Sequence, residues 1–275
     1  MDIINKQLGN YIIRKKIGQG GFSTVYLAES VSDHNLRVAC KVIPQIGKKG
    51  SQAIADARRE HKILKDLDHP GLPAVIDLLE DKKNFCLIEE YFPGETLKRV
   101  FLDAPESVRL NMKNIFMNLC KVMSYVHSKR IVHADIKLEN ILVSEEGKVC
   151  MIDFANARKG WERWLFWGRS VTGTRSFMAP EQIQNKRIDN RTDIYAMGIV
   201  FYYLLAGVFP FAASHEKDVL RKQLYNKPPK IKRGDVSPAM EQIVRRMLEK
   251  DPNNRYQHVG QILQEIKTQP VFREY

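Results

Sequence analysis

The sequence predicts an α+β protein in which a β-rich first third is followed by a larger, mostly helical part. Short runs rich in β-branched and aromatic residues, separated by glycine or polar turns, fill the chain to about residue 90. After Phe92-Pro93-Gly94 the apolar residues recur at helical spacing instead. We therefore expect a first lobe over residues 1–92 and a second lobe over residues 93–275, joined by a short hinge.

The first lobe is predicted to be a β-meander with one helix. Strands are expected at 11–17, 24–28, 36–43, 74–79 and 85–90, and the helix at about 52–66. In that helix Ile54, Ala57, His61 and Leu64 share one face. In the second lobe, helices are expected at 110–127, 194–206 and 240–248.

Composition and targeting signals favour an intracellular, cytoplasmic protein. No apolar run reaches the roughly 18 residues that a membrane-spanning helix needs, and the first residues lack the layout of a secretion signal. Four scattered cysteines form no C-x-x-C pair, which argues against a disulfide framework or a zinc site and for small buried side chains.

The charge of the chain is +12 and unevenly spread. Residues 217–233 hold seven basic side chains and one acid, Asp218. Such a run is expected to be a solvated face or, alternatively, a surface that attracts an acidic partner or protein substrate. No nucleic-acid partner is expected.

The first chemical motif runs from Ile17 to Val25 and places Gly18, Gly20 and Gly21 between two predicted strands. Glycine lets the backbone approach a phosphate because no Cβ is in the way and N–H groups can point inward. The motif is not a Walker A loop, because no G-K-[ST] follows, and it opens no helix as a dinucleotide fingerprint must. A plain hairpin is the alternative.

Lys41 lies in the middle of an apolar strand, where a lysine costs free energy to bury unless it is paired. Glu60 on the following helix is the expected counter-ion. Such an ion pair would hold the ammonium where phosphates can reach it. An edge-strand lysine in water is the alternative.

The decisive motif is the stretch 131–143, in which two apolar runs flank His133, Asp135, Lys137 and Asn140. Asp135 can accept a hydroxyl proton, Lys137 can neutralise a phosphoryl group, and the oxygen of Asn140 suits Mg²⁺. An apolar strand then delivers a second acid, Asp153. Two metal-binding oxygens on neighbouring loops suit an ATP-phosphate site.

The order of these motifs along the chain resembles that of the protein kinase superfamily: a glycine motif, a strand lysine, a helix glutamate, H-x-D-x-x-x-x-N, D-F-x and A-P-E. The resemblance covers residues 11–268 and extends to the stretches 173–181, 193–198 and 251–256. It implies the bilobal protein kinase fold, with a small antiparallel sheet lobe and a larger helical lobe. The M-A-P-E-Q and G-E-T-L stretches are similar to bacterial serine/threonine kinases.

The resemblance also implies the cofactors and the site. ATP with Mg²⁺, or Mn²⁺ in its place, would be used to phosphorylate Ser or Thr of protein substrates. The ATP-binding residues would be Ile17, Gly18, Gly20, Ser23, Val25, Ala39, Lys41, Glu60, Glu90 and Phe92. The catalytic residues would be the base Asp135 with Lys137, Asn140 and Thr174, and the metal ligands would be Asn140 and Asp153. The structural residues would be His133, Phe154, Glu181, Asp193 and Arg255, with Glu181 paired to Arg255 and Asp193 anchoring the catalytic loop.

The sequence departs from the family pattern at three positions of interest. Ala134 replaces the arginine that receives an activation-loop phosphate, so we expect no dependence on that phosphate. Ala155 replaces the glycine of D-F-G, which makes positive φ costly and predicts a less mobile segment. Glu89 is an unusual acid at the back of the adenine pocket, expected to reach polar groups near Lys41 or to turn to water.

Two other functions remain as alternatives. With its small residue between His133 and Asp135, the motif resembles that of aminoglycoside and choline kinases, which phosphorylate small molecules. Those enzymes, however, lack the segment ending in A-P-E. Loss of the family's arginine and glycine at Ala134 and Ala155 would instead suggest a pseudokinase, a binding module without catalytic activity. The presence of Lys41 and Asp135 argues against this alternative.

The most individual feature is the set of tryptophans Trp161, Trp164 and Trp167 between Asp153 and Glu181. A spacing of three residues brings them near one side of a helical turn. We expect them to pack internally and order the loop without phosphate. The alternative is an exposed anchor for a partner protein or an anionic membrane surface.

Overall fold

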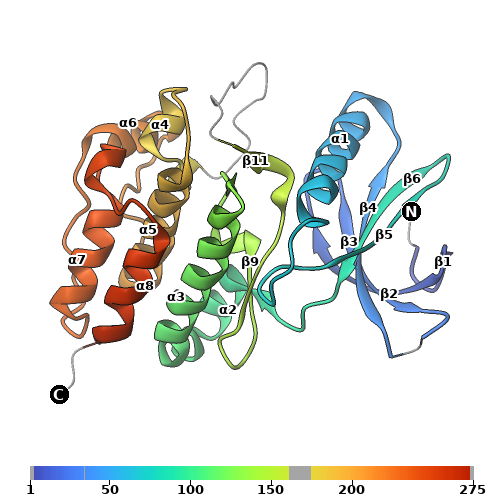
Figure 1. The fold of residues 1–275 in the computed structure, drawn as a ribbon, viewed down its shortest axis with the longest axis horizontal. Coiled ribbons are helices and arrows are strands. Elements are labelled where there is room, and N and C mark those ends of the chain that lie inside the picture. Colours follow the sequence, from blue (N-terminus) through green and yellow to red (C-terminus); the bar gives the residue numbers. More distant parts are fainter. Residues whose placement is uncertain (1–2, 34, 161–174, 273–275) are drawn as a thin grey trace. The chain divides into compact units, whose positions relative to one another are not determined.

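The computed structural model describes residues 3–33, 35–160 and 175–272, and these residues form two compact units. The first unit contains the chain up to Pro93 together with Asp153–Ala155, and the second contains Gly94–Ile152 and the chain from Asn156 onward. The expected α+β architecture is confirmed: one unit is built on an antiparallel sheet and the other is mostly helical (Figure 1).

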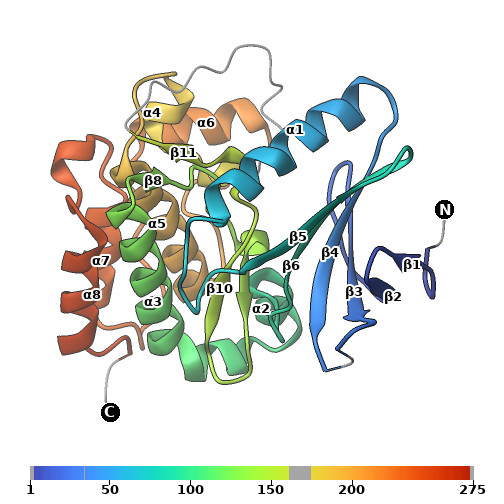
Figure 2. The same ribbon diagram turned by 45° about the vertical axis from the view of Figure 1, so that its right-hand side comes forward.

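The first unit is a six-stranded antiparallel sheet in the order β1-β2-β3-β4-β6-β5. Its strands are β1 (Gln7–Leu8), β2 (Tyr11–Gln19), β3 (Thr24–Ser30), β4 (Arg37–Pro44), β5 (Val75–Glu80) and β6 (Asn84–Glu90). The five strands predicted from the sequence correspond to β2–β6, with ends that differ by up to two residues. The long helix α1 (Gly47–Leu64) lies over one face of this sheet (Figures 1 and 2).

Side chains that alternate between the two faces of the sheet form two apolar layers in this unit. Val38, Cys40 and Val42 of β4 enter a core with β2, β3 and β6 on one face. On the other face Ile43 packs with Phe85, Leu87 and α1. Because successive residues of a strand point to opposite faces, Lys41 shares the α1-covered face with Ile43.

Helix α1 begins five residues earlier than the predicted start at residue 52 and ends two residues before the predicted end. Its first turn contains two glycines and no regularly spaced apolar residues, so hydrophobic periodicity does not predict this part of the helix. Gly50 has a packing role: a Cβ there would lie 2.6 Å from the carbonyl oxygen of Pro44.

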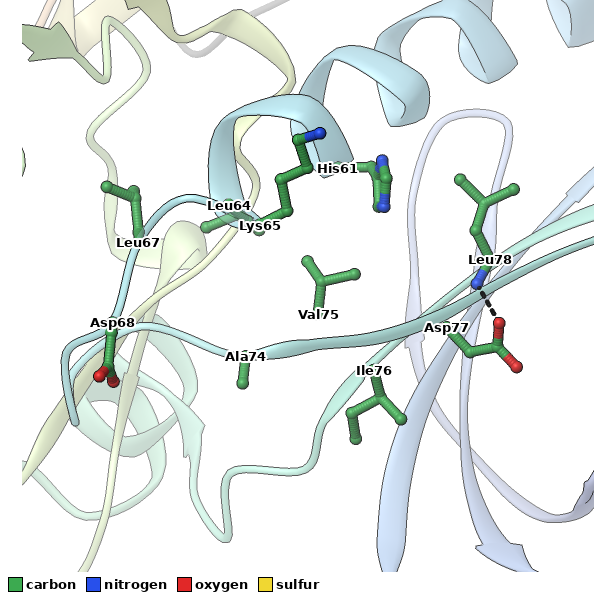
Figure 3. A pocket seen from close by; sticks show the side chains of 10 residues that line it. All are labelled: His61, Leu64, Lys65, Leu67, Asp68, Ala74, Val75, Ile76, Asp77 and Leu78. Atoms are coloured by element: carbon green, nitrogen blue, oxygen red, sulfur yellow. Dashed lines mark hydrogen bonds between the residues drawn. The ribbon is translucent and has the colours of Figure 1, made fainter.

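A surface hollow of about 550 Å³ lies between the end of α1 and strand β5 (Figure 3). His61 and Lys65 reach it from the helix, and Val75 points toward the helix from the strand while Ile76 points away. None of the residues expected to bind ATP lines this hollow.

The second unit is built around helix α5 (Asn190–Ala206), which is buried along most of its length. The other helices of this unit are α2 (Leu97–Asp103), α3 (Pro105–Ser128), α4 (Pro180–Ile183), α6 (Glu216–Tyr225), α7 (Pro238–Met247) and α8 (Val259–Thr268). The helices α3, α8, α7 and α5 lie side by side (Figures 1 and 2). Asp189 caps the start of α5 by accepting from the N–H of Arg191, and Gly207 ends it at φ +75°.

Short strand pairs position the loops of the second unit. One sheet joins β7 (Glu95–Thr96), β9 (Ile141–Val143) and β10 (Val149–Met151), and a second joins β8 (Ile131–Val132) to β11 (Arg158–Lys159). The stretch 133–140 therefore lies between the ends of β8, which is buried, and β9, which is buried except for the partly exposed Leu142. Sequence periodicity cannot reveal two-residue strands, and they were not predicted.

Within the parts of the chain that the structure describes, no helix is both long and apolar enough to cross a membrane. The expected burial of the four cysteines is confirmed, since Cys40, Cys86, Cys120 and Cys150 are all buried.

Candidate functional site

Lys41 is paired with a buried carboxylate in the first unit. Its Nζ lies 2.6 Å from Oε2 of Glu60, whose side chain is 1% exposed. Burial alone would lower the pKa of Lys41, but the carboxylates of Glu60, Asp153 and Glu89 outweigh burial and raise it. Lys41 is therefore an ammonium ion at neutral pH, held in position by Glu60.

Helix α1 also fixes the segment Asp153–Ala155, which belongs to the same unit. The second oxygen of Glu60 accepts from the backbone N–H of Phe154 at 2.8 Å, and Arg59 Nη1 donates to the carbonyl of Ala155 at 3.2 Å. Asp153 has φ +66°, and its Oδ1 lies 3.5 Å from Lys41 Nζ. Ala155 lies in a 3₁₀ turn outside the positive-φ residues, so its Cβ fits the backbone.

Glu89 shares the strand face that carries Lys41. Register pairs Glu89 with Ala39 and Leu87 with Lys41, so Glu89 and Lys41 are diagonal neighbours on one face. Among the described residues, the buried Oε1 of Glu89 has no hydrogen-bond partner. Burial, followed by repulsion from Glu60, raises the pKa of Glu89 to about 8. This oxygen is therefore turned inward, not to water.

The glycine motif is a tight hairpin between β2 and β3. Gly18 pairs with Val25, and the N–H of Gly20 donates to the carbonyl of Ser23 at 2.8 Å. A Cβ on Gly20 would lie 2.6 Å from Ser23 Oγ, so a side chain at residue 20 would force the Ser23 hydroxyl to move. Ile17 is 40% exposed beside this hairpin. Of the other residues expected to bind ATP in this unit, Ala39 lies on β4, Glu90 is the last residue of β6, and Phe92 follows that strand.

In the second unit the carboxylate of Asp135 is held on one oxygen. Lys137 Nζ donates to Oδ2 at 2.8 Å, and Nδ2 of both Asn140 and Asn156 lies 3.3 Å from the same oxygen. Asn140 Nδ2 also donates to the carbonyl of Asp135 at 2.9 Å. Among the described residues, these hydrogen bonds of the carboxylate all fall on Oδ2, and the side chain is 19% exposed.

The backbone before Asp135 is anchored by the buried carboxylate of Asp193 on α5. Asp193 accepts from the N–H groups of His133 at 2.9 Å and Ala134 at 2.8 Å, and His127 Nε2 lies 2.8 Å from Oδ2. Ala134 has φ +62°, a conformation that side chains with a Cβ rarely adopt. Gln182 holds the same residue from the other side, because its Nε2 donates to the carbonyl of Ala134 at 3.0 Å.

Glu181 and Arg255 form a buried bidentate ion pair. Two parallel contacts of 2.8 Å join Nη1 to Oε1 and Nη2 to Oε2. Arg255 also donates to the carbonyls of Glu249, Arg191 and Lys250, so its guanidinium is fully engaged. This pair connects α4 to the turn after α7.

Some functional residues were missed and others fall outside the described residues. Asn156 and Gln182 were not predicted, because isolated amides carry no periodic or motif signal in one sequence. Thr174 and the tryptophans Trp161, Trp164 and Trp167 lie in 161–174, outside the described residues, so the predictions about them stay predictions.

Comparison with known proteins identifies the family. The model of the protein kinase domain matches residues 11–272. A probable serine/threonine-protein kinase of Clostridium perfringens is 32% identical over 98% of this chain and 40% of its own length. Serine/threonine-protein kinase PrkC of Bacillus subtilis is 31% identical over 97% of this chain and 41% of its own.

A plant relative, CBL-interacting protein kinase 25 of Oryza sativa, is 30% identical over 87% of this chain and 47% of its own length. The chain thus spans about two fifths to one half of the length of these three curated relatives. These matches favour a protein kinase over a small-molecule kinase. The predicted family is confirmed: the chain belongs to the protein kinase domain family.

Proposed function

We propose that this chain transfers the γ-phosphoryl group of ATP to serine or threonine hydroxyls of proteins, with Asp135 as the base. The observation that carries the proposal is the asymmetry of the Asp135 carboxylate. Three side chains hold Oδ2, which leaves Oδ1 available to an acceptor hydroxyl. A base needs this combination of fixed orientation and one accessible oxygen.

Asp135 takes the proton of the acceptor hydroxyl as its oxygen attacks phosphorus; the bond from phosphorus to the β-phosphate oxygen breaks, and ADP leaves with that electron pair. Lys137, 2.8 Å from Asp135, is placed to neutralise phosphoryl oxygens beside the base. Asp193 and Gln182 hold the loop backbone, so its strained conformation at Ala134 persists without ligand.

In the first unit, Lys41 pairs with α- and β-phosphate oxygens, and Glu60 keeps its ammonium in position. The glycine hairpin lets backbone N–H groups approach the phosphates, with Ile17, Val25 and Ala39 beside the adenine. The backbone of Glu90 and Phe92 supplies the hydrogen bonds to adenine. Glu60, Lys41 and the N–H of Phe154 form one connected network, which supports these roles.

The donor chemistry of Asn140 and Asp153 fits Mg²⁺, or Mn²⁺ in its place. Asn140 directs its side-chain amide N–H groups at Asp135, so the oxygen is its ligand atom. Asp153 presents a carboxylate that is 35% exposed. Both are hard oxygen ligands of the kind that these cations bind. When bound, Mg-ATP supplies the phosphoryl group and the positive charge that stabilises its oxygens.

We also propose that the protein substrate is acidic. Lys227, Lys230 and Lys232 are exposed on the stretch that follows α6, whereas Arg233 is paired with Asp235 at 2.8 Å. The three lysines therefore offer positive charge to a partner. We propose a cytoplasmic location as well, because Cys40, Cys86, Cys120 and Cys150 are free and buried, as is usual in a reducing compartment.

The test compares acceptors in the presence of Mg²⁺ and labelled ATP. Phosphate should pass to dephosphorylated casein and not to choline or an aminoglycoside, and Lys41→Met should abolish transfer to casein. Transfer to the small alcohols alone would make this a small-molecule kinase. Nucleotide binding without any transfer would make it a binding module.

A further inference from the structure

The segment Arg175–Phe177, a 3₁₀ turn, is held against helix α6 by a buried amide. Gln223 on α6 is completely buried, and its Nε2 donates to the backbone carbonyl of Ser176. A second contact joins Arg175 to Glu216, the first residue of α6. The segment is thus attached to α6 at two adjacent residues.

A relay of hydrogen bonds from the interior reaches the same amide. Lys250 Nζ donates to the hydroxyl of Tyr195 at 3.0 Å, and that hydroxyl donates to Oε1 of Gln223. Tyr195 is completely buried on α5. The Nζ of Lys250 lies 3.8 Å from the centroid of the Phe211 ring, which holds the amine in place.

The relay fixes the direction in which Gln223 points. Lys250 gives an N–H to the oxygen of Tyr195, so the tyrosine O–H is free to donate onward. The glutamine must then turn its oxygen toward Tyr195 and its NH₂ toward Ser176. A flipped amide would place oxygen against the carbonyl of Ser176, and two acceptors repel. Burial, followed by the charge of Arg255, lowers the pKa of Lys250 to about 7, and both protonation states keep an N–H to donate.

The other end of the same segment is attached to the catalytic loop. Gln182 donates to the carbonyl of Ala134, the residue before Asp135, and its Oε1 accepts from the N–H of Ala179 at 3.0 Å. The stretch 175–182 therefore runs from α6 to the loop that carries the proposed base. An acceptor peptide whose hydroxyl reaches Asp135 must lie next to this stretch.

We propose that Gln223 is a positioning residue for the protein acceptor: oriented by Tyr195 and Lys250, it holds the carbonyl of Ser176 and so fixes the surface on which the acceptor lies. The inference rests on the proposed transfer to protein hydroxyls. Neither Gln223 nor Lys250 belongs to a sequence motif used above, and nothing else in the proposed mechanism needs them.

The test uses Gln223→Glu, which puts a carboxylate oxygen against the carbonyl of Ser176, and Gln223→Met, which removes both hydrogen bonds at similar size. Gln242→Glu on α7 is the matched control, because Gln242 is exposed. Loss of one buried hydrogen bond should raise the KM for dephosphorylated casein about tenfold, while the KM for ATP stays within about twofold. The control should match the wild type in both constants.

Hydrogen exchange provides a readout that does not depend on activity. The N–H of Met178 donates to the carbonyl of Arg175, and its exchange should accelerate in both Gln223 variants and not in Gln242→Glu. An unchanged KM for casein, a parallel rise in the KM for ATP, or unchanged exchange at 175–178 would each overturn the inference. If the wild type transfers nothing to casein, the proposed function fails, and exchange still decides whether Gln223 holds the segment.

Discussion

The buried pair of Glu181 and Arg255 gives a stability prediction that does not depend on catalysis. Glu181→Gln keeps the size of the side chain and removes its charge. The guanidinium of Arg255, whose side chain is 0% exposed, then loses its counter-ion in the interior. The new amide also places an NH₂ group where Arg255 or Thr192 now donates to Glu181, so a buried donor loses its acceptor.

The magnitude follows from the burial of both partners. Removing one partner of a buried, hydrogen-bonded ion pair typically costs about 3–5 kcal/mol, because the remaining charge stays out of water. The amide that replaces the Glu181 carboxylate still offers one acceptor oxygen, so we expect about 3 kcal/mol for this pair. For a chain of this length that corresponds to a fall in Tm of roughly 6–12 °C.

Urea unfolding followed by circular dichroism measures the free energy of unfolding, with Glu95→Gln as the matched control. Glu95 lies 3.3 Å from Arg99, but its side chain is 57% exposed, and such surface pairs contribute about 0–1 kcal/mol. The two variants should therefore differ by about 2 kcal/mol or more. Equal, small losses in both would refute the inference that burial makes the Glu181–Arg255 pair important.

The charged groups of the site and its surroundings give three more predictions. The pKa of Glu89 is about 8 in the folded chain against 4.5 for the free group, so between these pH values the folded state binds a proton that the unfolded state has lost. The free energy of unfolding should therefore fall as pH rises through this range. Glu89→Gln should flatten the dependence of Tm on pH from 5.5 to 8, and an unchanged slope would contradict the raised pKa of Glu89. Because Ala134 offers no arginine to a phosphate, phosphatase treatment should leave most of the peptide-kinase rate, and a hundredfold loss would contradict this. Replacing Lys227, Lys230 and Lys232 by Glu should raise the KM for an acidic protein at low salt and not at high salt; an unchanged KM would leave these lysines as a solvated face.

Much of the fold was predictable because its elements have strong local signals. The alternating strands and the amphipathic helix α3 have a clear apolar period, α5 is marked by a long apolar run, and the family motifs predicted the rest. The helices α2, α4, α6 and α8 were missed, since they have ten residues or fewer and three of them begin after loops with weak cap signals. Helices α2 and α8 pack on α3, whereas α4 and α6 pack on each other and α6 also packs on the turn at 175–177; one sequence does not display such contacts.

The residues of the site also differ in how far the sequence predicts their contacts. The contact between Lys41 and Glu60 was predictable because a lysine in an apolar strand needs a counter-ion and the next helix offers one. The amides were not: Gln182 holds Ala134 across 48 residues, and Gln223 holds Ser176 across 47. A neutral amide creates no charge imbalance in the sequence, so only the fold shows which carbonyl it meets.

The most direct measurement of the central claim is phosphorylation-site mapping with Asp135→Asn as the comparison. Wild-type protein, Mg²⁺, ATP and dephosphorylated casein should give phosphoserine or phosphothreonine by mass spectrometry. Asp135→Asn should bind ATP with nearly the wild-type Kd and lose about 10² to 10⁴-fold in transfer, the usual contribution of a positioned base. Near-wild-type transfer by Asp135→Asn, or an absence of phosphoserine and phosphothreonine in the wild-type reaction, would contradict the account.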